Sequence, residues 1–215
     1  MLTVRYALVL LLIASSQSAL AEEIGSVTIV QNQASVLHKG VAQPVSVEKG
    51  AGVFFEDTYQ TQQKSKVQIL FKDNTTLNIT EKSKIQITEY VYDPSKGVRR
   101  GVLQVLEGTV RAVVEKLFGS GSKFEIHTPS AVAAARGTDF IVAVATVDSL
   151  PVTTISTLEG VVDVSSSDAS IVGTVRLEEG HFTIVRMGRP PTPPIPIPGS
   201  QQSPVGESIV VPLPH

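Results

Sequence analysis

Short runs in which apolar and polar side chains alternate fill the chain between residues 22 and 188. Successive side chains of a β-strand point to opposite faces, so a period of two in β-branched residues is typical of half-buried strands. Gly, Asn, Asp and Pro lie between the runs, as chain reversals require. The pattern predicts strands at residues 27–30, 34–37, 41–47, 66–71, 76–79, 84–88 and 131–135.

The segment 102–118 is the one place where a helix competes with a strand. Residues 111–117 have helix-compatible composition, but Gly108 and the neighbouring valines favour a strand. We expect a strand through Val114 and leave residues 115–118 unassigned.

An acidic residue followed by glycine recurs before alternating runs. Leu-Glu-Gly occurs at 106–108 and again at 158–160, with fainter copies at 178–180 and 48–50. Such a repeated turn predicts positive φ at each glycine, because glycine adopts that conformation without a steric cost. The whole pattern predicts an all-β domain, built either as a β-sandwich or as stacked, solenoid-like coils.

The first 21 residues have the features of a cleavable signal peptide. Arg5 precedes a short apolar run at 7–14, and Ala19-Leu20-Ala21 matches the small-residue rule for cleavage before Glu22. No cysteine follows the apolar run, which excludes a lipoprotein anchor. We expect the mature chain to be periplasmic or secreted.

Composition narrows the classes of function. The chain has no cysteine, so disulfide and thiolate chemistry are excluded. Without Arg5, 17 basic residues face 20 acidic ones, which gives no electrostatic footprint for nucleic acid. No other apolar run is long enough to span a membrane. We expect one domain over residues 22–188.

Nine of the 13 prolines lie in residues 190–214. Proline has no amide donor, so we expect residues 189–215 to form a disordered, polyproline-like tail that cannot build a sheet. The tail is either an inert spacer or a docking peptide.

The histidines, His38, His127, His181 and His215, show no metal-ligand spacing, and no cofactor motif is present. His127 and Ser130 lack the residues of a nucleophile elbow. We therefore expect no metal, no cofactor and no enzymatic activity.

Arg136 is a lone charge within the small-residue run TPSAVAAARGTDFIV at 128–142. A buried guanidinium needs several acceptors, so one interpretation is a structural pin that forks onto backbone carbonyls and a carboxylate from Asp73, Asp139 or Glu159. It would tie one β layer to the next. The alternatives are an arginine that binds a ligand and, last, a catalytic one.

A second candidate surface lies just upstream. It consists of Tyr90, Tyr92, Lys96, Arg99 and Arg100. The tyrosines either contact a protein or sugar or simply pack on a neighbouring layer. The basic turn either meets an anionic envelope component or is a solvated loop.

The run FEIHTPSAVAAARGTDFIV resembles the signature of FecR-type domains, a periplasmic module associated with sigma-factor regulation. The matching positions are Phe124, Thr128, Pro129, Ala131, Arg136, Gly137, Thr138, Phe140 and Val142. LFKDNTTLNITEKSKIQITEYVYDP and LEGTVRAVVEKL also resemble family segments, and the likeness covers about residues 25–187. The resemblance implies the family's fold and a non-enzymatic module that binds a partner or ligand.

Two features depart from the family pattern. Asn74-Thr75 replaces the usual Gly-Ser after Asp73, so we expect a different hairpin turn. Only the predicted leader precedes the module, so a direct anti-sigma role is not carried over. We expect the partner to be an envelope protein. The alternative is a domain that binds a glycan or surface polymer, with the proline-rich tail as its tether.

Overall fold

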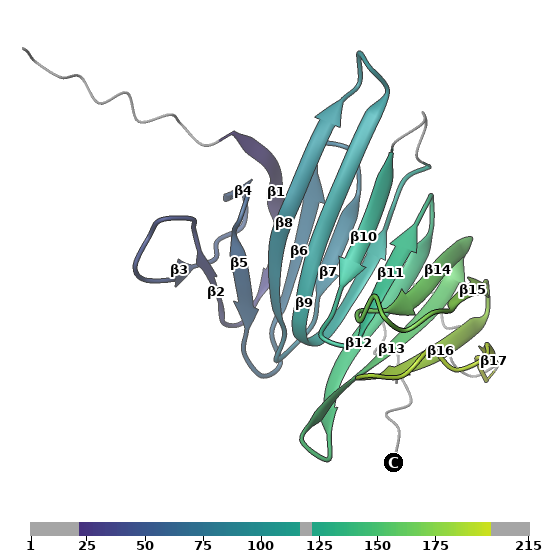
Figure 1. Ribbon diagram of the computed structural model, residues 1–215. Helices are drawn as coiled ribbons and strands as arrows, with labels where there is room; N and C mark the ends of the chain where they lie inside the picture. Colours follow the sequence, from purple (N-terminus) through teal and green to yellow (C-terminus); the bar gives the residue numbers. More distant parts are fainter. Residues whose placement is uncertain (1–21, 117–121, 199–215) are drawn as a thin grey trace, which may run out of the picture.

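The computed structural model describes residues 22–116 and 122–198, and every regular element in these ranges is a β-strand (Figure 1). The prediction of an all-β fold is confirmed. In this part of the chain no helix is long and apolar enough to cross a membrane.

The strands follow one another at short intervals. They are β1 (Glu23–Gln31), β2 (Ala34–Leu37), β3 (Val45–Ser46), β4 (Gly52–Phe54), β5 (Thr58–Thr61), β6 (Lys66–Phe71), β7 (Thr76–Ile79), β8 (Lys84–Asp93), β9 (Val98–Val113), β10 (Lys123–His127), β11 (Ala131–Ala135), β12 (Asp139–Val147), β13 (Leu150–Glu159), β14 (Val161–Ser166), β15 (Thr174–Glu178), β16 (His181–Arg186) and β17 (Ile195–Pro196).

Most predicted strands have the expected bounds. The strands β2, β6, β7 and β11 have the limits that the alternation predicted, and β1 and β8 contain the predicted cores. The run 41–47 is shorter than expected, since only Val45–Ser46 pairs with β2. The strand β9 ends at Val113, and residues 114–116 are not helical. Residues 117–118 lie outside the described residues.

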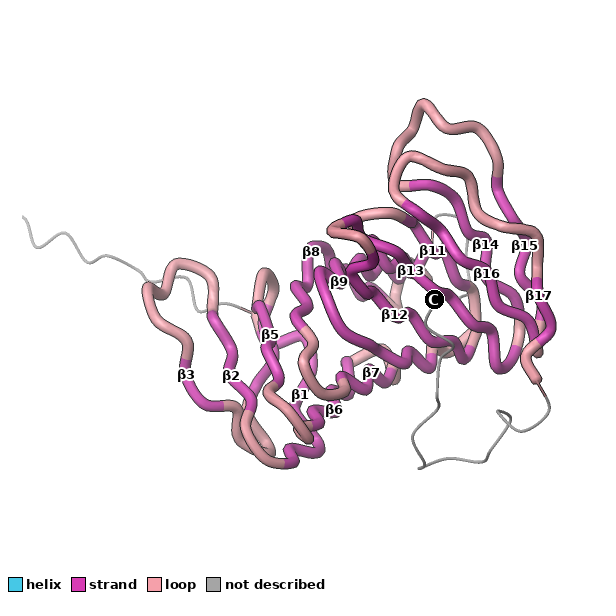
Figure 2. The backbone as a smooth tube through the Cα atoms, turned by 90° about the horizontal axis from the view of Figure 1, so that it is seen from below, coloured by secondary structure: helices cyan, strands magenta, loops and turns pink. Residues whose placement is uncertain are grey.

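Hydrogen bonding joins the strands into one mixed network that folds over into two layers (Figures 1 and 2). Layer 1 has the order β4-β1-β6-β7-β9-β12-β13-β16-β17. Layer 2 has the order β3-β2-β5-β8-β9-β10-β11-β14-β15. The pairs are antiparallel except β9–β10. In Figure 1, β6 and β7 of layer 1 lie behind β8 and β9.

The long strand β9 belongs to both layers. Glu107 pairs with Lys84 of layer 2, whereas the next residue, Gly108, pairs with Val144 of layer 1. The phase of burial changes at the same point, from buried Leu103 and Val105 to buried Val110 and Ala112. The strand thus keeps its apolar side chains in the interior while it changes layers.

The core lies between the two layers. Ile69 and Leu77 of layer 1 and Ile85 and Ile126 of layer 2 are all fully buried. Burying such a side chain contributes roughly 1.5–3 kcal/mol, so this interior is the main source of stability. The period-two alternation of each strand supplies one apolar face to it.

Each crossing between layers within residues 22–116 and 122–198 has a residue with positive φ. These residues are Asn32, Gly50, Glu56, Lys64, Lys82, Gly108, Gly137, Gly160 and Gly180. The prediction for the four acidic-glycine turns is confirmed, since φ is 85° at Gly50, 85° at Gly108, 84° at Gly160 and 73° at Gly180. The repeated motif is therefore the corner of the stack.

The β6–β7 turn shows how Asn74 replaces a glycine. Its φ is 65°, in the left-handed region that asparagine tolerates better than most residues. The Asp73 carboxylate accepts hydrogen bonds from the Thr75 amide at 3.1 Å and the Thr75 hydroxyl at 3.0 Å. These bonds hold the turn in place without Gly-Ser.

The expectation for the proline-rich segment is wrong for residues 189–198. Pro191 is buried, and Ile195–Pro196 pairs with β16 as an edge strand of layer 1. The amide of Thr192 donates to the Ile184 carbonyl at 3.0 Å. Non-proline residues supply the amide donors, and an edge strand tolerates proline on its outer side. Residues 199–215 and the predicted leader lie outside the described residues.

Alanine substitution at two corner glycines separates backbone strain from steric clash. Both Gly50 and Gly108 have φ of 85°, but a Cβ on Gly108 would lie 2.2 Å from Ser83 Oγ, and one on Gly50 would meet nothing within 4 Å. Gly50→Ala should lower the free energy of unfolding by about 1–2 kcal/mol. Gly108→Ala should cost at least about 2 kcal/mol more. Urea unfolding followed by circular dichroism measures both, and equal losses would contradict the corner packing.

Candidate functional site

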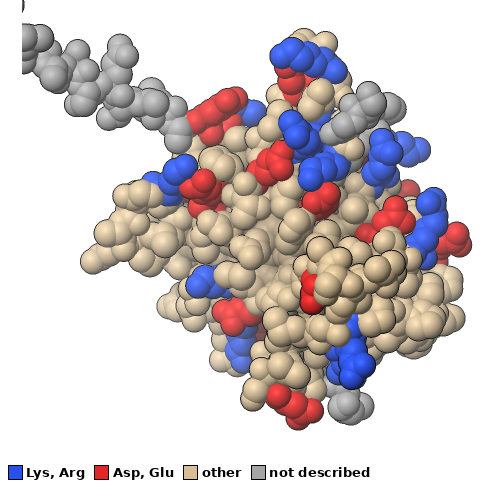
Figure 3. Space-filling view, viewed as in Figure 1, with Lys and Arg blue, Asp and Glu red and all other residues tan. Residues whose placement is uncertain are grey.

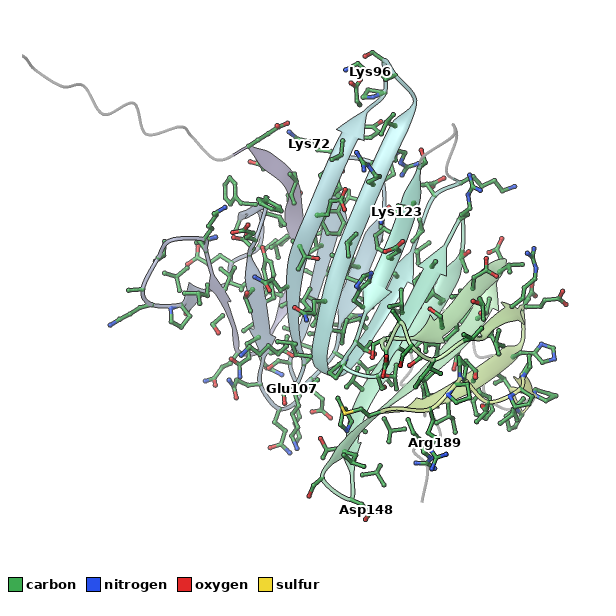
Figure 4. The ribbon with its side chains drawn as sticks, in the orientation of Figure 1. Lys72, Lys96, Glu107, Lys123, Asp148 and Arg189 are labelled. Atoms are coloured by element: carbon green, nitrogen blue, oxygen red, sulfur yellow. The ribbon has the colours of Figure 1, made fainter. Side chains whose placement is uncertain are left out.

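The β8–β9 hairpin carries the whole predicted surface. Its turn lies at Lys96, which Figure 4 places at the tip, far from Glu107 at the other end of β9's layer 2 portion. The structure brings together all five predicted residues on this hairpin: Tyr90, Tyr92, Lys96, Arg99 and Arg100. Successive side chains of a strand point to opposite faces, so some of these five side chains point inward and others outward.

Asp93 organises the tip of the hairpin. Its carboxylate accepts hydrogen bonds from the amides of Ser95 at 3.1 Å and Lys96 at 3.2 Å and from the Ser95 hydroxyl at 2.6 Å. The bond from Ser95 is the largest cause that lowers the pKa of Asp93 to about 2. Gly97, with φ of 62°, completes the reversal. The tip is therefore a defined turn rather than a loose loop.

Arg99 carries a largely buried guanidinium. Its side chain is 13% exposed, and its Nη2 lies 2.9 Å from Oδ2 of Asp73, which is 7% exposed. The same guanidinium donates to the backbone carbonyls of Asp73 and, at 3.4 Å, Lys116. Arg99 belongs to layer 2 and Asp73 to the β6–β7 turn of layer 1, so this group ties the layers together.

The interpretation of Arg136 as that pin is wrong. Arg136 is exposed, and its side chain makes no hydrogen bond or ion pair with the described residues. The physical reason is parity: Ala131, Ala133 and Ala135 fill the interior, so residue 136 falls on the outer side. Arg99 has the role that was assigned to Arg136, including the fork onto carbonyls and Asp73.

Tyr90 packs inside rather than forming an open binding face. Its ring stacks on Phe71, with centroids 5.4 Å apart and planes at 19°. Its hydroxyl oxygen accepts a hydrogen bond from the amide of Asp73 at 3.1 Å. Burial, and next the Asp73 charge, raise the pKa of Tyr90. Tyr90 therefore supports the Arg99–Asp73 pair.

Tyr92 is the aromatic residue that the hairpin presents to solvent. Its exposed fraction is 39%, close to the 37% of neighbouring Val91. The guanidinium of Arg99 lies 5.8 Å from the ring centroid, a cation–π distance. The hairpin thus presents the Tyr92 ring to solvent, with the Arg99 guanidinium next to it.

The basic side chains of this surface are paired with carboxylates. Lys96 lies 2.9 Å from Asp93, and Arg100 lies 3.6 Å from Glu89. On the adjacent strand β10, Lys123 lies 3.2 Å from Glu125. Figure 3 shows basic and acidic groups side by side over this part of the molecule. The charges are interspersed, so they form no single-sign patch for an anionic polymer.

His127 completes a row on the outer face of β10. Its Nε2 lies 2.8 Å from Oε2 of Glu125. Burial alone would raise the pKa of Glu125, but hydrogen bonds from His127 and Lys123 outweigh it and lower that pKa.

The Thr-Pro-Ser part of the signature forms a buried hydroxyl cluster. The Oγ1 of Thr153 lies 2.7 Å from both Thr128 Oγ1 and Ser130 Oγ. Ser130 also donates to the Val185 carbonyl at 3.0 Å. Thr128 and Ser130 are in the β10–β11 turn of layer 2, whereas Thr153 and Val185 belong to layer 1. The cluster is a second polar link between the layers.

The remaining signature residues shape the corner after β11. Gly137 has φ of 73°, and a Cβ there would lie 2.8 Å from Lys116 Cγ. Thr138 donates to the Val161 carbonyl at 2.9 Å, and Phe140 is fully buried. Pro129 offers its carbonyl to Ser167 at 2.8 Å, and Ala131 is fully buried. All of these contacts hold the fold together.

Sequence reasoning missed two carboxylate pairs. Asp57 is fully buried, and its carboxylate meets His38 Nδ1 at 2.7 Å and the Phe54 amide at 2.9 Å. Arg111 and Asp139 form a two-pronged pair, with distances of 2.8 and 2.6 Å, across β9 and β12. Only strand register brings these partners together, so spacing along the chain gave no signal for them.

Within the described ranges, no group of three or more His, Cys, Asp or Glu side chains is placed to hold a metal ion. A hollow of about 330 Å³ beside the β1–β2 corner is lined by neutral side chains such as Asn32, Ser35 and Gln62. Several of the buried polar groups, such as Arg99–Asp73 and Thr128–Thr153, connect the two layers.

Replacing Arg99 or Arg136 by alanine tests which of the two arginines connects the layers. Arg99→Ala leaves the Asp73 carboxylate buried without its partner, so we expect the free energy of unfolding to fall by about 3–5 kcal/mol. Arg136→Ala, the matched control, should change it by no more than about 0.5 kcal/mol, because that side chain is exposed. Chemical denaturation of both variants is the measurement. A larger loss for Arg136→Ala would restore the original assignment.

Comparison with known proteins agrees with this geometry. Residues 57–163 match the family model described as FecR protein, from the start of β5 into β14. No curated protein matches the chain.

Two crystal structures, at 1.65 and 2.50 Å resolution, of a protein described as a "putative anti-sigma factor" from Parabacteroides distasonis share the fold. Each is 16% identical over 67% of this chain, with TM-scores of 0.50 and 0.51. The match spans 61% of the length of those chains. Residues 57–163 are therefore a FecR domain.

Proposed function

We propose that the protein is an exported, non-enzymatic FecR module that binds an envelope protein and relays or scaffolds an envelope signal. The observation that carries this proposal is the FecR domain at residues 57–163. The fold shared with a protein described as an anti-sigma factor adds support, because such factors act by binding proteins.

The use of polar groups supports a binding module over an enzyme. The Arg99–Asp73 pair and the hydroxyl cluster of Thr128, Ser130 and Thr153 each connect the layers. These polar groups form their hydrogen bonds within the fold. A binding surface needs such rigid support.

The outer part of the β8–β9 hairpin is the surface that we propose for the partner. Tyr92 is exposed beside a tip that Asp93 holds in a defined turn, and Val91 is exposed on the opposite face of the same strand. Aromatic residues are enriched in protein interfaces, where they bury a large area for few lost rotamers.

A protein partner accounts for this surface better than a polysaccharide does. Tyr90 is stacked on Phe71, so the two tyrosines do not form a paired platform for a sugar. Lys96 and Arg100 have carboxylate partners, which leaves no row of unpaired cations for an anionic polymer.

Export through the predicted leader is part of the proposal. Cleavage after Ala21 predicts a secreted or periplasmic chain with Glu22 at its N-terminus. Expression in a bacterial host followed by fractionation and N-terminal sequencing measures this directly. A chain retained in the cytoplasm with Met1 intact would contradict export.

Truncation of Tyr92 tests the docking surface. Cross-linking in envelope extracts of the native host should capture a protein, and Tyr92→Ala should raise its Kd about tenfold, as loss of a central interface aromatic does. Ile195→Ala is the matched control, because Ile195 is also 39% exposed but lies on β17, at the edge of layer 1 far from β8. Thermal melts verify that both variants fold. Capture of carbohydrate alone, or equal effects of both substitutions, would overturn the proposal.

A further inference from the structure

The four edges of the two layers differ in length. Layer 1 ends at β4, with three residues, and at β17, with two, one of which is Pro196. Layer 2 ends at β3, with two residues, and at β15, with five. Within the described ranges, only β14 pairs with β15. Of the four terminal strands, β15 therefore presents the longest open edge (Figures 1 and 2).

This edge lacks most of the usual protections against pairing. Natural edge strands are commonly very short, bulged, interrupted by proline or lined with charged side chains, and of these features β15 has only the charges of Arg176 and Glu178. The strand β15 has the sequence TVRLE, without proline, and its register with β14 is regular. Val172, two residues before the strand, is 93% exposed. Such an edge is suited to accept another strand.

The two layers also end unevenly. In layer 1, β17 covers the outer side of β16. In layer 2, no described strand covers the corresponding side of β15. The stack is one strand short on this side.

We infer that the missing strand is β15 of a second copy of this chain, paired antiparallel about a two-fold axis at Leu177. Antiparallel pairing of identical strands is self-complementary, so one patch serves both copies. Both copies then contribute the same five residues, and layer 2 becomes continuous across the pair.

Charge complementarity selects this register. With Leu177 opposite Leu177, Arg176 of one copy lies opposite Glu178 of the other, and this occurs twice. A register centred on Arg176 would place the two arginines opposite each other, and one centred on Glu178 would oppose the two glutamates. Like charges directly opposite destabilise a sheet, whereas opposite charges stabilise it.

The burial of the side chains on each face of β15 supports the same register. Arg176 and Glu178 are exposed on the outer face, whereas Leu177 is buried on the inner face. Pairing at Leu177 continues the interior from one copy to the next, with the ion pairs outside. A shift by one residue would mix the two faces.

Arg176 and Glu178 are available to form ion pairs with a second copy. Asp163 of β14 lies opposite Arg176 within the chain, and Val161 lies opposite Glu178. Among the described residues neither Arg176 nor Glu178 has an oppositely charged partner within 4.0 Å. Each can therefore turn towards a second copy.

Analytical ultracentrifugation of the full chain over a range of concentrations tests this inference. We expect reversible association to twice the monomer mass. Arg176→Glu places acidic residues opposite each other and should weaken the dimer about tenfold, as should Glu178→Arg. The double variant restores opposite charges and should return to within about threefold of the original Kd.

The matched control reverses a charge elsewhere. Lys39→Glu changes an exposed ion pair with Glu56, 3.0 Å away and far along the stack from β15, and should leave the dimer unchanged. Melting temperatures confirm that each variant is folded. A chain that stays monomeric at all concentrations, or a double variant as weak as the single ones, would overturn the inference.

Hydrogen exchange gives an independent readout. Outward-facing amides of β15 should become more protected as concentration rises, and Arg176→Glu should abolish that increase. Protection that is independent of concentration would mean that something other than a second copy occupies the edge, and would overturn the inference. Neither result depends on the envelope partner, so the proposed function is tested separately.

Discussion

The structure depends on a constraint at the corners between its two layers. A β-strand cannot turn from one layer to the other within a few residues unless one residue leaves the extended region, and the left-handed region provides the sharpest turn. The chain meets this demand with glycine at positions such as Gly108 and Gly160, and with asparagine or a charged residue elsewhere. The amides at the corners are also satisfied, as when Gly50 donates to the Val27 carbonyl at 2.7 Å. The crossings determine which layer each strand joins.

Polar groups then fasten the layers where apolar packing ends. The Arg99–Asp73 pair closes the open side below the β8–β9 hairpin, and the Thr128–Thr153–Ser130 cluster closes another. Removing one partner of a buried ion pair strongly destabilises a fold, whereas replacing the whole pair by apolar residues often does not. These links therefore specify how the layers are aligned, whereas the interior of isoleucine, leucine and valine supplies the stability.

Much of the fold could be predicted from the sequence, for definite reasons. Alternation gave the bounds of strands such as β6, and the Glu-Gly repeats gave the glycine corners. The non-glycine corners at Glu56 and Lys64 could not be predicted, because charged residues rarely adopt positive φ. Residues 189–198 were expected to be unable to build a sheet, but the threonine and isoleucines between the prolines supply the donors that proline lacks.

The candidate site was harder to predict than the fold. The small-residue run suggested a buried Arg136, although the parity of Ala131, Ala133 and Ala135 already placed residue 136 outside. Arg99 was grouped with Arg100 as part of a basic turn, yet neighbouring strand residues face opposite ways, and Arg99 shares its side with Leu103 and Val105. The partner, Asp73, is distant in sequence, so only the register of the two layers brings it into contact.

The division of β9 between the layers is the central claim, and nuclear Overhauser effects between backbone protons test it most directly. The account predicts contacts from residues 98–107 to β8 and β10, and contacts from residues 108–113 to β7 and β12, with the change between Glu107 and Gly108. Backbone contacts from residues 109–113 to β8 or β10 would show that β9 remains in one layer, and would contradict the account.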